Sequence, residues 1–291
     1  MAKTLLYMSY GEERYHQETM FSILSALRFR SSVTEWNIRV YTDKPQLYEW
    51  LGVETSELTT SMIDGWIGSV CGYPFRRKIA CVFEELLKTE GQLAFLDGDT
   101  YFKRNPDLLF SRIKESRFCL HLPEFRLTSR LGSPGEVLRN LLEKEEIRYA
   151  SGSRAFLSND ECMWNSGVIG LSSHDYNLIG QAIKLIDDMW VYERRIHTLE
   201  QFAVGHVFSR HGQIDRTDDI VFHYWHERQR RPFLRRLPAL ISRSKGMPLQ
   251  EAAEWAYEAR PVEPLQRRAL GLLRKALHQL GINHRWMQTS Y

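Results

Sequence analysis

The sequence contains no long hydrophobic segment. No window approaches about 18 consecutive apolar residues, the length that a transmembrane helix needs, so a membrane-spanning helix is excluded. The N-terminal apolar stretch ends before Glu12 and Glu13 and is too short for a secretory signal. We therefore expect a cytoplasmic protein.

Cysteine is also scarce, with 4 residues in a chain of 291. Cys71, Cys81, Cys119 and Cys162 form neither a Cys-x-x-Cys pair nor a zinc-type spacing, which predicts reduced thiols rather than a disulfide framework. A Gly-x-Gly-x-x-Gly run after a strand is missing too, and this disfavours a dehydrogenase.

Neither sign of charge is in large excess. The 39 Lys and Arg residues against 36 Asp and Glu give a net charge of +3, which excludes a nucleic-acid binder that depends on bulk charge. The balance conceals an asymmetry, because residues 221–291 hold 13 basic and 5 acidic residues. That end carries +8 and the rest −5, which suggests an anionic partner for the basic end.

Apolar residues make up 43% of the chain, which is enough to form the buried core of one large domain. Apolar runs that predict strands alternate with amphipathic stretches that predict helices. The predicted strands cover 4–9, 37–42, 93–96, 117–122 and 167–171, and the predicted helices cover 17–29 and 77–87. This alternation predicts an α/β fold with a mostly parallel central sheet flanked by helices, whose ligands bind at the carboxyl ends of the strands.

A pair of acids follows the strand predicted at 93–96. In an extended chain Asp97 and Asp99 point to the same side, and two such anions repel unless a cation lies between them. Gly98 permits the turn and the approach of a bulky anionic ligand to the backbone. Carboxylate oxygens suit Mg²⁺ or Mn²⁺ bridging to substrate phosphates. An isolated Asp-x-Asp is otherwise a plain turn.

An apolar strand that ends in Asp-x-Asp near residue 100 resembles the GT-A glycosyltransferases, in particular their glycogenin-like and lipopolysaccharide sugar-transferase branch. Three further segments support the resemblance, which covers residues 3–235: Met163–Gly170, Thr198–Phe202 and Asp219–Arg228. It implies transfer of a sugar from a nucleotide-diphosphate donor, expected to be UDP-linked, to a hydroxyl of a glycan, glycolipid or protein. It also implies a divalent metal, with Asp97, Asp99 and His223 as ligands and the imidazole favouring Mn²⁺ over Mg²⁺.

The resemblance further implies catalytic roles for Glu200 and Asn165. The family usually has Asp where this chain has Glu200, which would orient the acceptor or act as a base. The implied donor-binding residues, besides the two aspartates, are Tyr7, Met8, Ser9, Tyr10, Asp43, Arg77, Lys78, Gly98, Asn165, Ser166, Gly167, Gln201, His226 and Arg228. Turns, helix-terminal charges and solvated basic residues are the plain alternatives at these positions.

The sequence leaves open the stereochemical outcome of the reaction and two alternative functions. The glycogenin-like branch favours retention of configuration, whereas inversion needs an in-line carboxylate such as Glu200. A non-catalytic nucleotide-sugar-binding protein of the same fold is one alternative. A sugar-1-phosphate nucleotidyltransferase is another, disfavoured because residues 9–13 hold one glycine and two acids rather than a glycine-rich loop.

The end of the chain differs in character, which predicts a catalytic domain at 1–235 and a basic helical extension at 236–291. A helix predicted over 264–280 is apolar on one side and basic on the other. Such a helix can lie on an anionic membrane surface, or its apolar face can pack against the catalytic domain.

Overall fold

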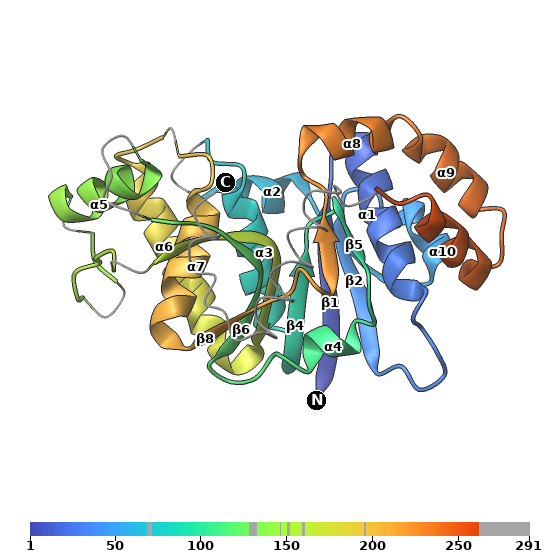
Figure 1. The fold of residues 1–291 in the computed structure, drawn as a ribbon, viewed down its shortest axis with the longest axis horizontal. Helices are drawn as coiled ribbons and strands as arrows, with labels where there is room; N and C mark the ends of the chain where they lie inside the picture. The colour runs from blue at the N-terminus through green and yellow to red at the C-terminus, as the bar shows by residue number, and fades with distance from the viewer. Residues whose placement is uncertain are drawn as a thin grey trace, which may run out of the picture.

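A seven-stranded sheet runs through the centre of the computed structural model (Figure 1), which describes residues 1–68, 72–127, 133–145, 147–149, 152–158, 161–194 and 196–261. The strand order is β3-β2-β1-β4-β7-β6-β8, and β5 and β9 form a second, two-stranded sheet. The strands are β1 (Ala2–Ser9), β2 (Trp36–Thr42), β3 (Glu54–Glu57), β4 (Gly91–Leu96), β5 (Thr100–Phe102), β6 (Arg117–Arg126), β7 (Cys162–Ser172), β8 (Gln213–Arg216) and β9 (Val221–His223).

The sheet is mostly parallel, as predicted. The neighbours β3, β2, β1 and β4 all pair in parallel, as do β6 and β8, whereas β7 is antiparallel to both β4 and β6. Every predicted strand lies inside an observed one. The predicted fold class, α/β with a mostly parallel central sheet flanked by helices, is confirmed.

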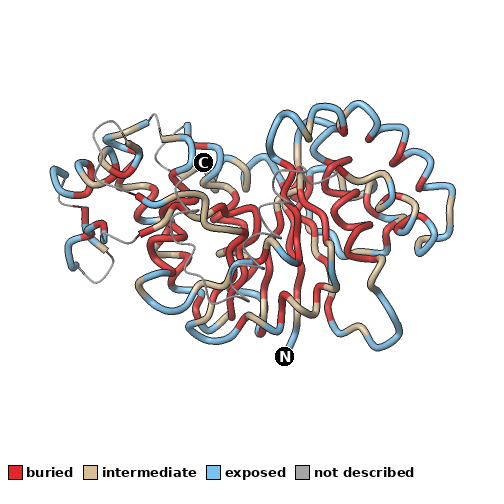
Figure 2. The backbone as a smooth tube through the Cα atoms, viewed as in Figure 1, coloured by how far each residue is buried: buried red, intermediate tan, exposed pale blue. Residues whose placement is uncertain are grey.

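Helices cover both faces of the sheet. They are α1 (Glu13–Leu27), α2 (Thr60–Ile67), α3 (Arg76–Leu86), α4 (Asp107–Phe110), α5 (Pro134–Lys144), α6 (Tyr176–Trp190), α7 (Leu199–His211), α8 (Glu227–Leu234), α9 (Leu237–Ser244) and α10 (Leu249–Glu258). The core divides accordingly: Leu6 packs with α3, α6 and α7, whereas Leu5 and Tyr7 pack with α1 and α10. Alternate side chains of a strand point to opposite faces, so one apolar run fills both layers, and Figure 2 shows the buried residues along the strands and the inner sides of the helices.

The segment after residue 235 packs on the same core as far as the structure describes it. Leu237, Leu240 and Ala253 are buried against α1, so α9 and α10 extend the layer that α1 begins. The helix predicted over 264–280 lies outside the described residues, and the division at 235 stays a prediction. Among the described residues, each helix is too short or too polar to cross a bilayer.

One detail of the sequence interpretation needs correction. The run Asn165-Ser166-Gly167 was expected to precede its strand, but it lies inside β7, which begins at Cys162. The strand is long because β7 pairs with β4 at one end and with the extended end of β6 at the other. The polar residues therefore stand in the sheet itself, opposite the end of β4.

Candidate functional site

The aspartate pair lies in the tight connection between β4 and β5. The backbone N–H of Asp97 donates to the carbonyl of Gly167 at 2.9 Å, and the Thr100 hydroxyl donates to the carbonyl of Asp97 at 2.7 Å. A Cβ on Gly98 would lie 2.7 Å from Oγ1 of Thr19 in α1. The space that this glycine leaves is thus occupied by α1, not held open for a ligand as the sequence interpretation assumed.

His223 reaches the pair through the small sheet. Thr100 of β5 is the register partner of His223 in β9, and the N–H of Tyr224 donates to the carbonyl of Asp99 at 3.0 Å. As a result, Nε2 of His223 lies 3.0 Å from Oδ1 of Asp99 and 4.0 Å from Oδ2 of Asp97. Pairing of the two strands brings residues 124 positions apart into contact.

These three side chains form a set that fits a divalent cation. One potential ligand atom from each of Asp97, Asp99 and His223 lies within 4.8 Å of the other two. Their side chains are 27%, 12% and 7% exposed, so the cluster is open to solvent mainly at Asp97. Two carboxylates and one imidazole suit Mn²⁺ or Mg²⁺. His226 is not in this group, because its Nδ1 accepts from the N–H of Arg228 at the start of α8.

Asn165 orients the imidazole. Its amide nitrogen donates to Oε1 of Glu124 at 2.9 Å, and its Oδ1 accepts from the N–H of Gly167 at 2.9 Å. The same Oδ1 lies 2.9 Å from Nδ1 of His223, which must therefore carry the proton. In the neutral imidazole the lone pair is then on Nε2, directed at the aspartates, as a metal ligand requires.

Lys78 supplies the nearest positive charge to Asp97. Its buried ammonium donates to Oδ2 of Asp97 at 2.8 Å and to Oγ of Ser166 at 3.1 Å. Arg77, one residue earlier on α3, points elsewhere and donates to the hydroxyl of Tyr10 at 3.1 Å. The helix phase thus separates two basic residues that the sequence left equivalent.

Glu200 and Gln201 approach from the first turn of α7. Gln201 accepts from the N–H of Ser166 at 3.1 Å, and Ser166 Oγ lies 3.4 Å from Oε1 of Glu200. The other Glu200 oxygen accepts a short hydrogen bond from the Tyr73 hydroxyl. Burial raises the pKa of the Glu200 carboxyl above its usual range, partly offset by Lys78.

The residues at the ends of β1 and β2 that are predicted to bind the nucleotide of the donor differ in their burial. Asp43 accepts from the N–H of Gly11 at 3.1 Å and lies 3.2 Å from Nε2 of His16. Ser9 is buried with its Oγ 3.2 Å from Nδ1 of His16, and Tyr10 is half-buried. Tyr7 is fully buried, and its hydroxyl accepts a hydrogen bond from Ser22. Met8 is half-buried and packs against the core.

Arg228 and Arg230 differ although both lie on α8. Arg228 is exposed, whereas Arg230 forms an ion pair with Oδ2 of Asp99 at 3.2 Å and another with Glu18 of α1. Burial raises the pKa of the Asp99 carboxyl, but His223 and Arg230 outweigh it and hold that pKa well below its usual range. Sequence reasoning missed Arg230, Glu18 and Tyr73, because nothing in the local pattern distinguishes them from neighbours of the same type.

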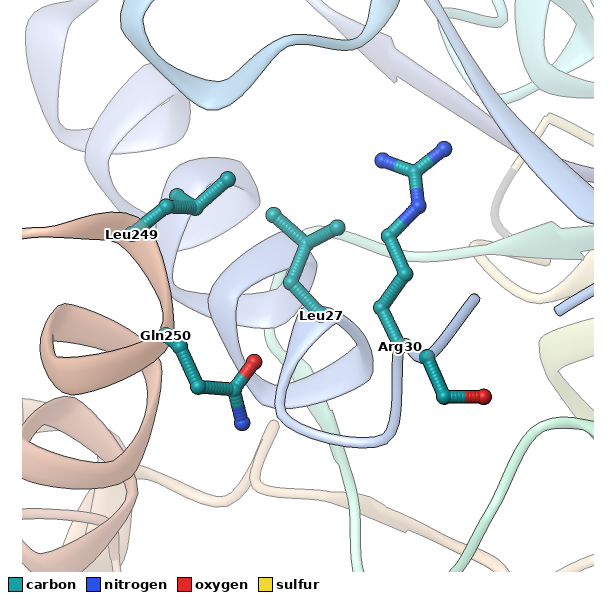
Figure 3. A pocket seen from close by; sticks show the side chains of 5 residues that line it. Leu27, Arg30, Leu249 and Gln250 are labelled. Carbon is teal, nitrogen blue, oxygen red and sulfur yellow. The ribbon is translucent and has the colours of Figure 1, made fainter. Parts of the chain in front are cut away.

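A separate hollow lies between the end of α1 and the start of α10 (Figure 3). It is lined by Leu27, Arg30, Ser31, Leu249 and Gln250, and it contains none of the predicted site residues. Its lining offers a single ionisable group, Arg30, and the hollow is at the opposite end of α1 from Glu18. The chemistry-bearing residues are therefore gathered at the carboxyl end of β4, not here.

The chain matches no known family profile and no curated protein. Its fold is similar to solved glycosyltransferases. Mouse xyloside xylosyltransferase 1 is 12% identical, with 74% of this chain and 85% of that chain covered and a TM-score of 0.46. GlyE of Streptococcus pneumoniae TIGR4 is 12% identical, with 90% and 65% covered and a TM-score of 0.49. An active-site variant of LgtC is 8% identical, with 74% and 73% covered and a TM-score of 0.48.

The Asp-x-Asp pair follows the central strand β4 directly, at the carboxyl end of a strand in a mostly parallel sheet. Similarity at this level, below a TM-score of 0.5, carries no information about substrate or metal. Any activity has to be inferred from the residues of this chain.

Proposed function

We propose that this protein is a metal-dependent glycosyltransferase that moves a sugar from a nucleoside-diphosphate donor to a hydroxyl acceptor. One observation carries the proposal: Asp97, Asp99 and His223 present ligand atoms within 4.8 Å of one another at the carboxyl end of β4. Ligands of open α/β sheets bind at this edge. A buried lysine, Lys78, adjoins the cluster, as expected for a site that handles phosphate charge.

A bound Mn²⁺ or Mg²⁺ would neutralise the charge that develops on the departing diphosphate, and such electrostatic stabilisation is usually the largest catalytic term. The residues of the chain divide the remaining work. Asp97 and Asp99 supply carboxylate ligands, and Asn165 keeps the proton of His223 on Nδ1, away from the ligand position. Lys78 lies within 2.8 Å of Asp97 and is available to a donor phosphate.

Glu200 fits the role of a support better than that of an in-line base. Its carboxylate is buried, with one oxygen facing Ser166 and the other bound to Tyr73. In that position it fixes Ser166 and attracts Lys78, both of which border the aspartate pair. Gln201 holds the backbone of Ser166 from the same helix turn. We infer that Glu200 and Gln201 shape the sugar pocket together with Gly167.

The remaining donor contacts follow from position. Tyr10 and Asp43, at the ends of β1 and β2, are the proposed partners of the nucleobase and ribose of a UDP-linked donor, with Arg77 beside Tyr10. Arg228 is exposed just beyond β9 and is proposed to reach the diphosphate. A glycan, glycolipid or protein hydroxyl is the proposed acceptor.

Binding and turnover are tested separately. A thermal-shift screen of nucleotide sugars with and without Mn²⁺ should show one nucleoside-diphosphate class that stabilises the protein. Saturation at about 100 times Kd adds about 2.7 kcal/mol, which raises the Tm of a chain of this size by several degrees. If no nucleoside diphosphate raises the Tm, the proposal is wrong. Binding without donor hydrolysis or transfer would instead identify the non-catalytic alternative.

The metal requirement has its own variant. Asp99→Asn keeps the size of the side chain but removes a ligand charge and the ion pair with Arg230. Metal-dependent transfer should therefore be lost while circular dichroism still shows the wild-type fold, with a lowered Tm. Undiminished turnover in this variant would refute the metal site.

Peripheral membrane attachment is a separate proposal. It depends on the basic amphipathic stretch 264–280, which lies outside the described residues. Sedimentation with anionic liposomes, with and without residues 260–291, tests it. Equal partitioning of the two forms would exclude this attachment.

A further inference from the structure

Asp99 has a different partner on each carboxylate oxygen. Its Oδ1 lies 3.0 Å from Nε2 of His223, on the side of the proposed metal. Its Oδ2 lies 3.2 Å from a terminal nitrogen of Arg230, which comes from α8. Oδ1 is thus the oxygen in contact with the imidazole, while Oδ2 is already engaged by the guanidinium of Arg230.

Arg230 is held in turn by a buried carboxylate. Its Nε donates to Oε1 of Glu18 at 2.9 Å, and its second terminal nitrogen donates to Oε2 at 2.7 Å. Glu18 lies in α1 and its side chain is 1% exposed, whereas that of Arg230 is 25% exposed, so the carboxylate end of this bidentate pair is shielded from water. All three nitrogens of the guanidinium are engaged, which leaves no free fork for a donor phosphate.

The geometry points to a role for this pair in metal selection. We propose that Arg230, fixed by Glu18, is a positioning residue that restricts Asp99 to single-oxygen coordination and so favours Mn²⁺ and Mg²⁺ over Ca²⁺. Ca²⁺ takes more ligands, commonly through bidentate carboxylates, whereas the smaller Mg²⁺ demands near-octahedral geometry. This inference rests on the proposed function, since it requires that the aspartate pair binds a metal.

Single neutral substitutions would confuse geometry with charge. Removal of Glu18 alone leaves the guanidinium of Arg230 with an excess positive charge against Asp99, beside the metal position, and removal of Arg230 alone leaves the buried carboxylate of Glu18 without this ion pair. The double variant Glu18→Gln/Arg230→Met removes one charge of each sign; glutamine keeps the size of Glu18, and methionine keeps an unbranched apolar stem at position 230 without the guanidinium. It therefore frees Oδ2 of Asp99 without changing the net charge of the site.

The matched control is a second buried glutamate–arginine pair. Glu85 is 0% exposed, and its Oε1 accepts from Arg39 at 2.7 Å. That pair joins α3 to β2, and in the part of the chain that the structure describes its polar contacts are with Glu54, Tyr41 and Thr89 rather than with the metal-site side chains. Glu85→Gln/Arg39→Met should therefore lower the Tm without changing the affinity for Mn²⁺.

The experiment measures metal binding to the full chain without donor. Free Mn²⁺ is titrated by electron paramagnetic resonance, and Ca²⁺ affinity is obtained by competition. We expect the Glu18→Gln/Arg230→Met variant to lose about 10–100-fold in Mn²⁺ affinity, the usual effect of losing a residue that orients a metal ligand. Its affinity for Ca²⁺ should fall less, so the preference for Mn²⁺ over Ca²⁺ narrows.

The possible results separate the two claims. Wild-type affinity and an unchanged Mn²⁺/Ca²⁺ ratio in the double variant would overturn the positioning role while leaving the metal site intact. A wild-type protein that binds no Mn²⁺ would overturn the proposed function and this inference together. If the double variant does not fold, Arg230→Lys provides the test. It keeps the charge but loses the fork geometry, so the Mn²⁺/Ca²⁺ ratio should again narrow, and an unchanged ratio would overturn the inference.

Discussion

Replacing Gly167 with alanine, which adds only a methyl group, should displace the imidazole of His223. An alanine Cβ at this position would lie 2.3 Å from Nδ1 of His223 and 2.6 Å from its Cε1. The ring has to move by about 1 Å to restore an ordinary contact of 3.4 Å. It cannot do so freely, because Nδ1 is bound to Asn165 and the opposite nitrogen faces Asp99.

The Gly167→Ala substitution should lower both the affinity for the metal and the folding stability. Displacing a metal ligand or the group that orients it lowers affinity about 10–100-fold, equivalent to about 1.4–2.8 kcal/mol. Overpacking adds about 1–3 kcal/mol of lost folding stability. The Gly167→Ala variant should therefore bind Mn²⁺ weakly and also unfold at a lower temperature than the wild type.

The control separates these two costs. Gly170 lies in the same strand, β7, and a Cβ there would come within 2.9 Å of the Cβ of Cys119 and the Cδ1 of Ile113. Gly170→Ala should lower the Tm by a similar amount and leave Mn²⁺ binding unchanged. Titration of free Mn²⁺ by electron paramagnetic resonance, with Tm from circular dichroism, measures both. Wild-type Mn²⁺ affinity in Gly167→Ala would refute the assignment of His223 as a ligand.

Two further predictions concern pH. Burial raises the pKa of Glu200, and the hydrogen bond from Tyr73 lowers it again. Tyr73→Phe removes this hydrogen bond, so the acid limb of the pH profile of kcat/KM should move to higher pH. An unmoved limb would show that ionised Glu200 is not required. At Asp219, burial raises the pKa, but hydrogen bonds from Arg112 outweigh it and the net pKa lies below 3.8. This stabilisation is present above the pKa of the unfolded chain and is lost as pH falls through the native pKa. Asp219→Asn should therefore lower the free energy of unfolding, measured in urea titrations, by more at pH 7 than at pH 3, and equal effects at both would contradict this prediction.

The sequence predicted the elements well where local patterns decide them. The strand ending at Leu96 and the helix predicted over 77–87, observed as Arg76–Leu86, follow from apolar periodicity and from the polar residues that bound them. The direction of β7 was not predictable, because an apolar run has the same pattern in a parallel and an antiparallel strand. Its pairing between β4 and β6 decided the direction and placed Asn165 within the sheet.

The site shows the same division. Asp97 and Asp99 could be identified from the sequence as two acids that directly follow an apolar strand, although the structure holds them in a turn after Leu96 and not in extended backbone. The resemblance had already named His223 as the third ligand, and the pairing of β5 with β9 is what brings its imidazole beside the aspartates. Selecting Lys78 over Arg77 required the phase of α3.

The sequence by itself thus determined the α/β class and the position of the carboxylate pair, because both depend on backbone periodicity over a few residues. Only the tertiary structure decided what surrounds that pair. The contact between Glu18 and Arg230 joins residues 212 positions apart. Such a contact depends on where α1 and α8 pack, and no local pattern encodes the packing of two distant helices against one strand end.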